Sequence, residues 1–254
     1  MNGSPGVSAL PFLHFGLIVT GKGEERFLPS LFRPLMATGR CNFEVIRRIG
    51  QRSPITSQKR QLTMVRTGRV MTDKDEEEIG LTARRYVMKR RNTFVLVVDD
   101  LEGDRAAQQT GVFRRYRDVL DRMLGDQQHR ASVHFLVNML EAYFFADARA
   151  VNAVLSTAWQ DFAGDVETIR HPKNDLKTLV HGYNEIEHGE QILAQLDVPL
   201  VLSRVDTCAS LRTMFAWCSR ALGEPLTDQF QLEKGRYNPV TQPQIDALPQ
   251  RRLD

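Results

Sequence analysis

The sequence predicts an α/β protein in which a parallel-rich sheet is flanked by helices and followed by a helical C-terminal cap and an extended tail. Strand-like and helix-like segments alternate through the first 140 or so residues, and helix-like segments alone follow them. The apolar run 93–98 is rich in β-branched residues and ends abruptly in acids, which is typical of a buried parallel strand. We expect one domain with a core over 10–147, a cap over 148–222 and a proline-containing tail over 223–254.

Composition and cysteine usage place the chain among ordinary intracellular globular proteins. Of its 254 residues, 42% are hydrophobic and 26% are charged, which suffices for one substantial core. The three cysteines are widely spaced without a CxxC pair, so we expect no disulfide framework or zinc knuckle, and a reducing, cytoplasmic location. The most apolar early stretch, 10–19, is far short of the roughly 20 residues of a membrane span, so no membrane association is expected.

The first half of the chain contains two expected strand–helix units. An apolar run over 12–20 ends at a glycine and predicts a strand, and apolar residues at helical spacing over 24–36 predict the helix after it. Residues 42–49 predict a second strand, and 50–69 a long loop rich in Gly, Pro, Ser and basic residues. Thr72 is the expected N-cap of a helix with acids in its first turn and basic residues in its last.

The second half begins with the strand over 93–98 and then becomes helical. A long amphipathic helix is expected over 105–124, a strand over 131–137 and the start of a further helix over 138–145. Proline residues 172 and 199 are expected breaks between the later helices. Those helices are expected at 148–155, 176–183, 189–196 and 207–222. The four prolines of the last 30 residues predict an extended tail that lies on the domain or on a partner.

The formal charge of +3 conceals a strongly basic N-terminal half. Before Asp99 there are 17 Lys and Arg against 8 Asp and Glu, and from Asp99 onward 17 against 23. Between positions 40 and 68 the basic residues are opposed by Glu44 alone, which suits a polyanion such as nucleic acid. A solvated basic face is the alternative. The phosphate-binding candidates in this stretch are Arg47, Arg48, Arg52, Lys59 and Arg60.

Four carboxylates, Asp99, Asp100, Glu102 and Asp104, fall within six residues directly after the strand 93–98. Such a cluster repels itself unless a cation lies among its members, and Mg²⁺ and Mn²⁺ prefer carboxylate oxygens. In an extended segment Asp100 and Glu102 point to one side and Asp99 to the other, so we expect the first two to bind the ion and hold Asp99 in reserve. The alternative is that these acids only end the strand or cap the next helix.

Several segments in order resemble Toprim-like proteins of the OLD/RloB type, which include nuclease subunits of prokaryotic defence systems that pair with ABC-type ATPases. Residues 17–25, Leu-Ile-Val-Thr-Gly-Lys-Gly-Glu-Glu, resemble the first strand and turn of that family, and 94–102 its acidic strand. Residues 138–147, Asn-Met-Leu-Glu-Ala-Tyr-Phe-Phe-Ala-Asp, are similar to a third motif with a Glu before an aromatic residue. Segments 171–176 and 204–222 resemble its C-terminal region. The resemblance implies a Toprim-like sheet and a metal-dependent nuclease.

The chain departs from the family at the end of the first strand, where Thr20 stands in place of the catalytic Glu. A threonine hydroxyl can neither bind the metal as a carboxylate does nor act as a general base at neutral pH. Glu24 lies one helical turn further on and is the candidate to reach inward as a metal ligand. The alternative is that Glu24 only complements the dipole at the start of a helix.

Three more side chains complete the candidate site. Glu141 lies among apolar residues, and a buried carboxylate needs a partner, which would be a metal, Lys173 or a backbone N–H group. Lys22 precedes a helix and would hold a phosphate at its N-terminus. Lys173 would neutralise charge in a phosphoryl-transfer transition state. Without the resemblance, either lysine is an ordinary surface residue.

The leading hypothesis is therefore a nuclease that uses Mg²⁺ or Mn²⁺ to hydrolyse DNA or RNA, as the effector subunit of a defence complex. Asp100 and Glu102 would bind the ion, and Glu24 or Glu141 would complete its shell. One rival is a catalytically degenerate scaffold that partners an ABC-type ATPase, which the threonine at position 20 favours. The other is a nucleic-acid-binding subunit without catalysis, favoured by the basic stretch. The choice of DNA or RNA, the identity of the ion and oligomerisation stay open.

Overall fold

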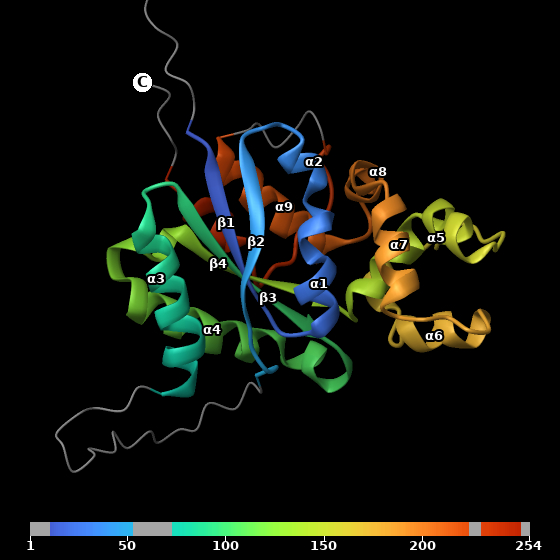
Figure 1. The fold of residues 1–254 in the computed structure, drawn as a ribbon, viewed down its shortest axis with the longest axis horizontal. Coiled ribbons are helices and arrows are strands. Elements are labelled where there is room, and N and C mark those ends of the chain that lie inside the picture. Colours follow the sequence, from blue (N-terminus) through green and yellow to red (C-terminus); the bar gives the residue numbers. More distant parts are fainter. Residues whose placement is uncertain (1–10, 53–72, 224–229, 250–254) are drawn as a thin grey trace, which may run out of the picture.

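A computed structural model describes residues 11–52, 73–223 and 230–249 of the chain. Over these residues the sheet has four strands in the order β2-β1-β3-β4, and every neighbouring pair is parallel. The predicted α/β class with a parallel sheet flanked by helices is confirmed (Figure 1). The strands are β1 (Leu13–Val19), β2 (Cys41–Arg48), β3 (Thr93–Leu101) and β4 (Ala131–Val137).

Helices cover both faces of the sheet, because β1 and β3 carry apolar residues on both sides. Phe15, Leu17 and Val98 pack in one cluster with α1 (Lys22–Leu31), α2 (Arg33–Met36) and α9 (Ala209–Leu222). Ile18 and Val97 face the opposite cluster with α3 (Leu81–Lys89) and α4 (Gln109–Leu124). Strands buried on both faces are typical of parallel sheets.

The structure divides the predicted helix over 24–36 into α1 and α2 at Phe32, which has a non-helical backbone. Pro34 lies in the first turn of α2, where its missing N–H group costs no helical hydrogen bond. A continuous helix would have required that N–H group in its interior. The predicted loop over 50–69 is described only up to Arg52, and the Thr72 cap lies outside the described residues.

Short 3₁₀ and π segments join the regular elements. A π-helical turn η1 (Glu76–Gly80) leads into α3, η2 (Gly103–Gln108) and η3 (Gly125–Arg130) flank α4, and η4 (Leu140–Ala146) follows β4. The segment over 138–145 was predicted to begin a regular helix. It forms η4 instead, after Asn138 and Met139, which both adopt positive φ.

The helices between η4 and α9 form a lobe beside the carboxyl ends of the strands (Figure 1). The lobe is held to the core by Arg33, whose Nη2 donates to the carbonyls of Leu193 and Ala194 at 2.8 and 2.9 Å. Its elements are α5 (Ala148–Leu155), η5 (Val166–Thr168), α6 (Pro172–Leu179), α7 (Glu187–Gln195) and α8 (Val198–Ser203). None of the described helices has the length and apolar character needed to cross a bilayer.

The two prolines that were expected to separate the later helices lie at boundaries between helices, where each begins a new one. Pro172 opens α6, so this helix starts four residues before the predicted Leu176, and Pro199 lies in the first turn of α8, which was not predicted. Proline is favoured in the first turn because its fixed φ suits a helix. The last predicted cap helix, α9, packs on the sheet, where Trp217 meets Phe94 edge to face.

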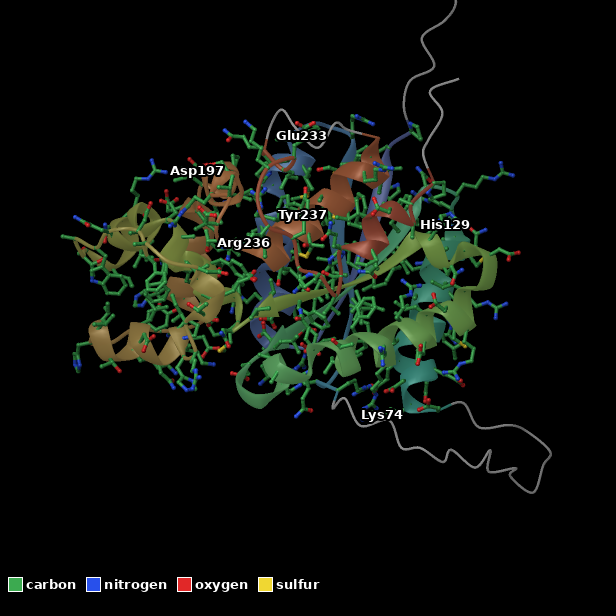
Figure 2. All side chains as sticks on the ribbon, turned by 180° about the vertical axis from the view of Figure 1, so that it is seen from behind. Lys74, His129, Asp197, Glu233, Arg236 and Tyr237 are labelled. Atoms are coloured by element: carbon green, nitrogen blue, oxygen red, sulfur yellow. The ribbon has the colours of Figure 1, made fainter. Side chains whose placement is uncertain are left out.

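The tail was expected to lie either on the domain or on a partner, and its described part, residues 230–249, lies on the domain. Its α10 (Pro243–Asp246) carries Gln244, whose amide accepts from the N–H of Val133 and donates to its carbonyl, both at 2.8 Å. The side chain therefore covers part of the outer edge of β4. Figure 2 shows Tyr237 of the same segment near α9, and its ring faces the guanidinium of Arg212.

Candidate functional site

A cavity of about 220 Å³ lies at the carboxyl edge of the sheet. In open α/β sheets ligands bind at this edge, where neighbouring strands lead the chain in opposite directions. Strand β1 is at that point, because β2 lies on one side of it and β3 on the other. The cavity is lined by segments that follow all four strands and by the lobe: Gly21, Lys22, Gly23, Glu24, Phe27, Gln51, Asp100, Glu102, Met139, Leu140, Glu141, Phe144, Lys173, Glu185 and Gly189.

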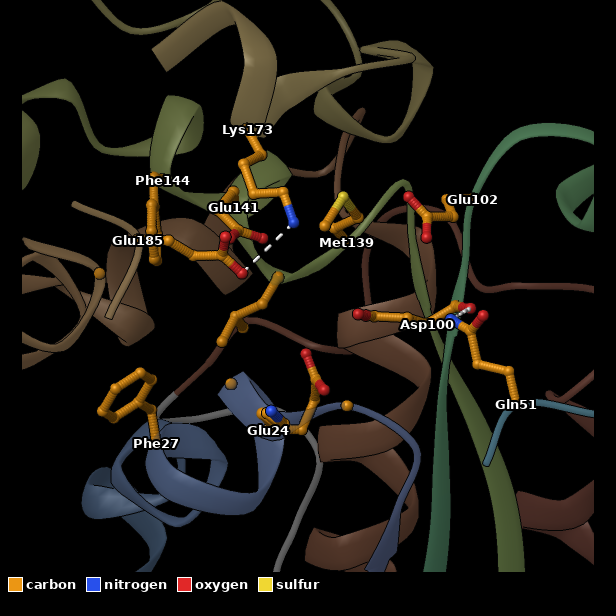
Figure 3. A pocket seen from close by; sticks show the side chains of 15 residues that line it. Glu24, Phe27, Gln51, Asp100, Glu102, Met139, Glu141, Phe144, Lys173 and Glu185 are labelled. Atoms are coloured by element: carbon orange, nitrogen blue, oxygen red, sulfur yellow. Dashed lines mark hydrogen bonds and ion pairs between the residues drawn. The ribbon is translucent and has the colours of Figure 1, made fainter. Parts of the chain in front are cut away.

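Six of the predicted site residues meet in this cavity although they span 152 positions of the chain, from 22 to 173. Figure 3 shows the carboxylate of Glu24 directed upward from the start of α1 and that of Asp100 directed inward from β3. The six are Lys22, Glu24, Asp100, Glu102, Glu141 and Lys173. The alternation of side chains along β3 accounts for the pairing of Asp100 and Glu102 on this side.

Asp100 and Glu24 form a buried pair of neighbouring carboxyl groups. They are 7% and 4% exposed, the two carboxyl groups lie within hydrogen-bond reach of each other, and Oδ1 of Asp100 and Oε2 of Glu24 have no partner outside the pair. Burial raises the pKa of Asp100 well above its ordinary value, and the adjacent carboxylates of Glu24 and Glu141 raise it further. Burial likewise raises the pKa of Glu24. Both shifts favour the protonated form of the pair, and a bound cation would oppose them.

Glu24 reaches this place because the residue at the turn before α1 is glycine. The carboxylate of Glu24 folds back over Gly21, so that a Cβ atom built on Gly21 would lie 1.7 Å from Oε2. The backbone of Gly21 is extended, with φ −108° and ψ 163°, so its conformation alone does not require glycine. The close approach of the Glu24 carboxylate is what favours glycine at this position. This role of Gly21 was not predicted, since no local pattern reveals where a side chain three residues later will fold.

Thr20 ties the end of β1 to β3 and does not line the cavity. Its hydroxyl donates to Oδ1 of Asp99 at 2.9 Å and accepts from the N–H of Asp100 at 3.2 Å. The side chain is buried. The residue that replaces the expected Glu is thus a structural link between two strands.

Asp99, the reserve metal ligand of the prediction, lies on the opposite face of the sheet from the cavity. It is fully buried, and its carboxylate accepts from Thr20, from the hydroxyl of Tyr116 at 2.8 Å and from Arg105. Burial raises its pKa, and these hydrogen bonds oppose the rise. With both oxygens already bonded within the protein, Asp99 is left out of the ligand set that we propose below.

Glu141, Lys173 and Glu185 form the wall of the cavity that faces the lobe. The Nζ atom of Lys173 lies 3.3 Å from Oε1 of Glu185, as Figure 3 shows. Burial raises the pKa of Glu141 to about 7, while the charge of Lys173 opposes the rise. Burial disfavours the charged form of Lys173, but Glu185 and Glu141 outweigh this and raise its pKa. Glu185 was not predicted, because it comes from the loop between α6 and α7 and carries no recognisable motif.

The charges around the cavity favour a divalent cation. Five carboxylates line it, from Glu24, Asp100, Glu102, Glu141 and Glu185, against two lysines. Across the described residues, however, no three His, Cys, Asp or Glu side chains stand close enough together to hold one metal ion. Glu102 is exposed and lines the same cavity as the buried pair. The excess of carboxylates and the two unpartnered oxygens fit Mg²⁺ or Mn²⁺, whose preferred ligands are oxygens.

The prediction that Arg52 binds phosphate is wrong. Its side chain is 7% exposed, its Nε donates to Oδ1 of Asp75 at 2.7 Å, and its Nη2 pairs with Glu78. Arg115 also pairs with Asp75, at 2.7 Å. A buried guanidinium that is already paired with two carboxylates is not available to a substrate.

The other basic candidates are distributed around β2. Arg48 pairs with Glu25 at 2.7 Å in an exposed ion pair, and Arg47 lines a separate groove with Arg85 and Lys89. Lys59 and Arg60 lie outside the described residues. The structure thus leaves Arg47 and Arg48 as surface candidates for phosphate contacts.

Comparison with known proteins gives one match. No curated protein and no solved structure matches the chain. A protein-family model described as "Domain of unknown function (DUF4276)" matches residues 19–216, a range that starts at the last residue of β1 and ends within α9. Every residue that lines the cavity falls in this range. Since the match covers well over half of its length, the chain belongs to the DUF4276 family.

Proposed function

We propose that this protein is a divalent-metal-dependent nuclease that hydrolyses phosphodiester bonds in DNA or RNA. The observation that carries the proposal is the buried pair of Asp100 and Glu24, two carboxyl groups that line a cavity at the carboxyl edge of the sheet and have oxygens with no partner outside the pair. Buried carboxylates without a partner are costly, and a hard divalent ion satisfies them. The sequence resemblance to Toprim-like nucleases supports the same assignment.

The side chains around the cavity divide the work of such a reaction. Asp100 and Glu24 would hold Mg²⁺ or Mn²⁺, and Glu102 or Glu141 would complete the shell. When bound, the ion would lower the pKa of a water molecule and stabilise the charge that develops on the phosphate. Lys22, at the first position of α1, would hold a phosphate oxygen near the helix N-terminus. Lys173, oriented by Glu185, would offer a second positive charge.

Nucleic acid is the proposed substrate because the N-terminal half of the chain is basic. Part of this positive charge lies on β2, a strand of the sheet whose carboxyl edge forms the cavity. Arg47 and Arg48 are at the carboxyl end of β2, and Gln51, three residues beyond, lines the cavity. Exposed arginines at such a place suit a phosphate backbone that leads into the site. The role as an effector subunit paired with an ABC-type ATPase rests on the resemblance alone.

A catalytically inactive scaffold is the second candidate. Two observations favour it: Thr20 serves as a link between strands, and no three potential ligands gather closely enough for one ion in the described residues. A scaffold of this kind would keep the fold and lose the metal. Metal binding therefore separates the two candidates directly.

The test is calorimetric titration of Mn²⁺ into the protein and into a variant with Asp100→Ala and Glu102→Ala. A matched control carries Glu77→Ala and Asp118→Ala, which remove the same two residue types from exposed positions outside the cavity. We expect the parent and the control to bind Mn²⁺ and to cleave plasmid DNA or tRNA, and the cavity variant to do neither. Equal Mn²⁺ affinity in all three proteins would refute the proposed site, and absence of binding in the parent would favour the scaffold.

A further inference from the structure

The main chain of Asp100 continues past the end of its neighbouring strand. Pairing between β1 and β3 ends at Val19 and Val98, whereas β3 goes on to Leu101 beside β4. Successive residues of a strand direct their N–H and C=O groups to opposite sides. The carbonyl of Leu101 accepts from Asn138 on the β4 side at 2.7 Å, so both main-chain groups of Asp100 point to the side that β1 has left.

Three side chains replace the missing strand. The hydroxyl of Thr20 accepts from the N–H of Asp100 at 3.2 Å, and Nε2 of Gln51 donates to the carbonyl of Asp100 at 3.3 Å. Nη1 of Arg105 donates to the same carbonyl. Two buried main-chain groups are thereby satisfied, as such groups must be for the strand to continue in the interior. Arg105 itself does not line the cavity.

Arg105 holds two consecutive residues of β3 and a third segment at once. Besides the carbonyl of Asp100, it pairs with the carboxylate of Asp99 on the other face of the sheet. Its Nη2 and Nε also donate to the carbonyl of Arg52 at 3.0 and 3.3 Å. A planar guanidinium with five donors can make this set of bonds, and a lysine ammonium cannot.

This arrangement decides which of the two acids faces the cavity. Neighbouring residues of a strand lie on opposite faces, so a slip by one residue would turn Asp99 toward the cavity and Asp100 away from it. Arg105 opposes such a slip because it holds the carboxylate of Asp99 on one face and the carbonyl of Asp100 at the edge. Tyr116 strengthens the hold on Asp99 from α4.

We propose that Arg105 is a positioning residue that fixes the backbone of Asp100 so that its carboxylate points into the cavity. The inference rests on the proposed function, because positioning matters only if Asp100 binds a ligand there. Residues that orient a metal ligand through hydrogen bonds typically change metal affinity by about 10–100-fold when they are replaced. Arg105 would act through the main chain of the ligand residue.

The experiment compares Arg105→Gln and Arg105→Lys with Arg115→Gln as the matched control. Arg115 is similarly buried and makes the same kind of ion pair, but with Asp75 in place of Asp99. Hydrogen exchange of the peptide that contains the Asp100 amide reports on the backbone without a metal. Calorimetric titration of Mn²⁺ reports on the ligand.

We expect Arg105→Gln to speed exchange at Asp100 and to weaken Mn²⁺ binding by about tenfold or more, with Arg105→Lys between it and the parent. The control should leave both measurements near those of the parent. If Arg105→Gln does not fold, Arg105→Lys carries the test with the same two measurements. Unchanged exchange at Asp100 overturns the inference. If exchange accelerates and the parent binds no Mn²⁺, the backbone role holds while the proposed nuclease function fails.

Discussion

Replacing Gly21 with alanine should displace the carboxylate of Glu24 while the fold stays intact. The added Cβ would lie 1.7 Å from Oε2 and 2.8 Å from Cδ of Glu24, whereas non-bonded heavy atoms settle at about 3.5 Å, so the carboxylate must move by roughly 1.5–2 Å. A misplacement of about 1 Å can cost on the order of 100-fold in rate. The backbone dihedrals of Gly21 are ordinary for alanine, so the thermal unfolding temperature should change little.

Gly23→Ala is the matched control for this substitution. It adds the same methyl group two residues away in the same turn, where a Cβ meets nothing within 4 Å. Because Gly23 lies in α1, alanine should raise stability by up to about 1 kcal/mol, and its methyl group should leave the carboxylate of Glu24 in place. The assays are Mn²⁺ titration and plasmid or tRNA cleavage. Equal affinity and cleavage in the two variants would refute the reasoning that Glu24 acts from this position.

Two further predictions concern single residues near the cavity. The pKa of Glu141 is about 7 in the folded protein against an ordinary value of 4.5, so the native state binds the proton more tightly and stability should fall as pH rises between these values, by about 3 kcal/mol in total. Glu141→Gln cannot ionise and therefore lacks this pH-dependent loss of stability. In metal-free urea titrations the stability of the variant relative to the parent should be higher at pH 8 than at pH 5. The same difference at both pH values would argue against a raised pKa of Glu141. Thr20→Glu should lower both stability and Mn²⁺ affinity, because it places a carboxylate beside Asp99 and removes the acceptor for the Asp100 N–H group. If this variant instead binds Mn²⁺ more tightly than the parent, the natural site lacks a carboxylate at the end of β1 and the substitution restores it.

The sheet was largely predictable from sequence because β1, β3 and β4 contain short apolar runs, and β2 ends shortly before a glycine. Strand β4 was predicted over its full length, and β1 and β2 to within a residue at each end. The prediction ended β3 at Val98, but the strand continues through two aspartates to Leu101. Acidic residues disfavour strands by local propensity, and here the tertiary bonds from Thr20 and Arg105 override it.

The candidate site was predictable where a local pattern carried the information. Alternation along an extended segment was enough to place Asp100 and Glu102 on one side, and the turn before α1 was enough to single out Lys22. Glu24 was proposed from the family resemblance, as the nearest carboxylate to Thr20. Arg52 was misassigned because a basic stretch shows only charge, and the acids that bury this side chain lie more than 20 residues further along the chain. Long-range partners of this kind have no local signature.

The position of Glu24 explains how the cavity keeps a carboxylate beside Asp100 although β1 is followed by a threonine. Because the carboxylate comes from the first turn of α1 and folds back over Gly21, the end of the strand is free to hold Asp99 and Asp100 through the hydroxyl of Thr20. Two carboxyl groups held side by side in the interior are costly to ionise, because burial and their mutual repulsion both disfavour the charged forms. A scaffold without a ligand would be more stable with an amide or an apolar residue at either position. The arrangement is understandable if a cation offsets this cost, so the energetics of the buried pair favour metal binding over the inactive scaffold.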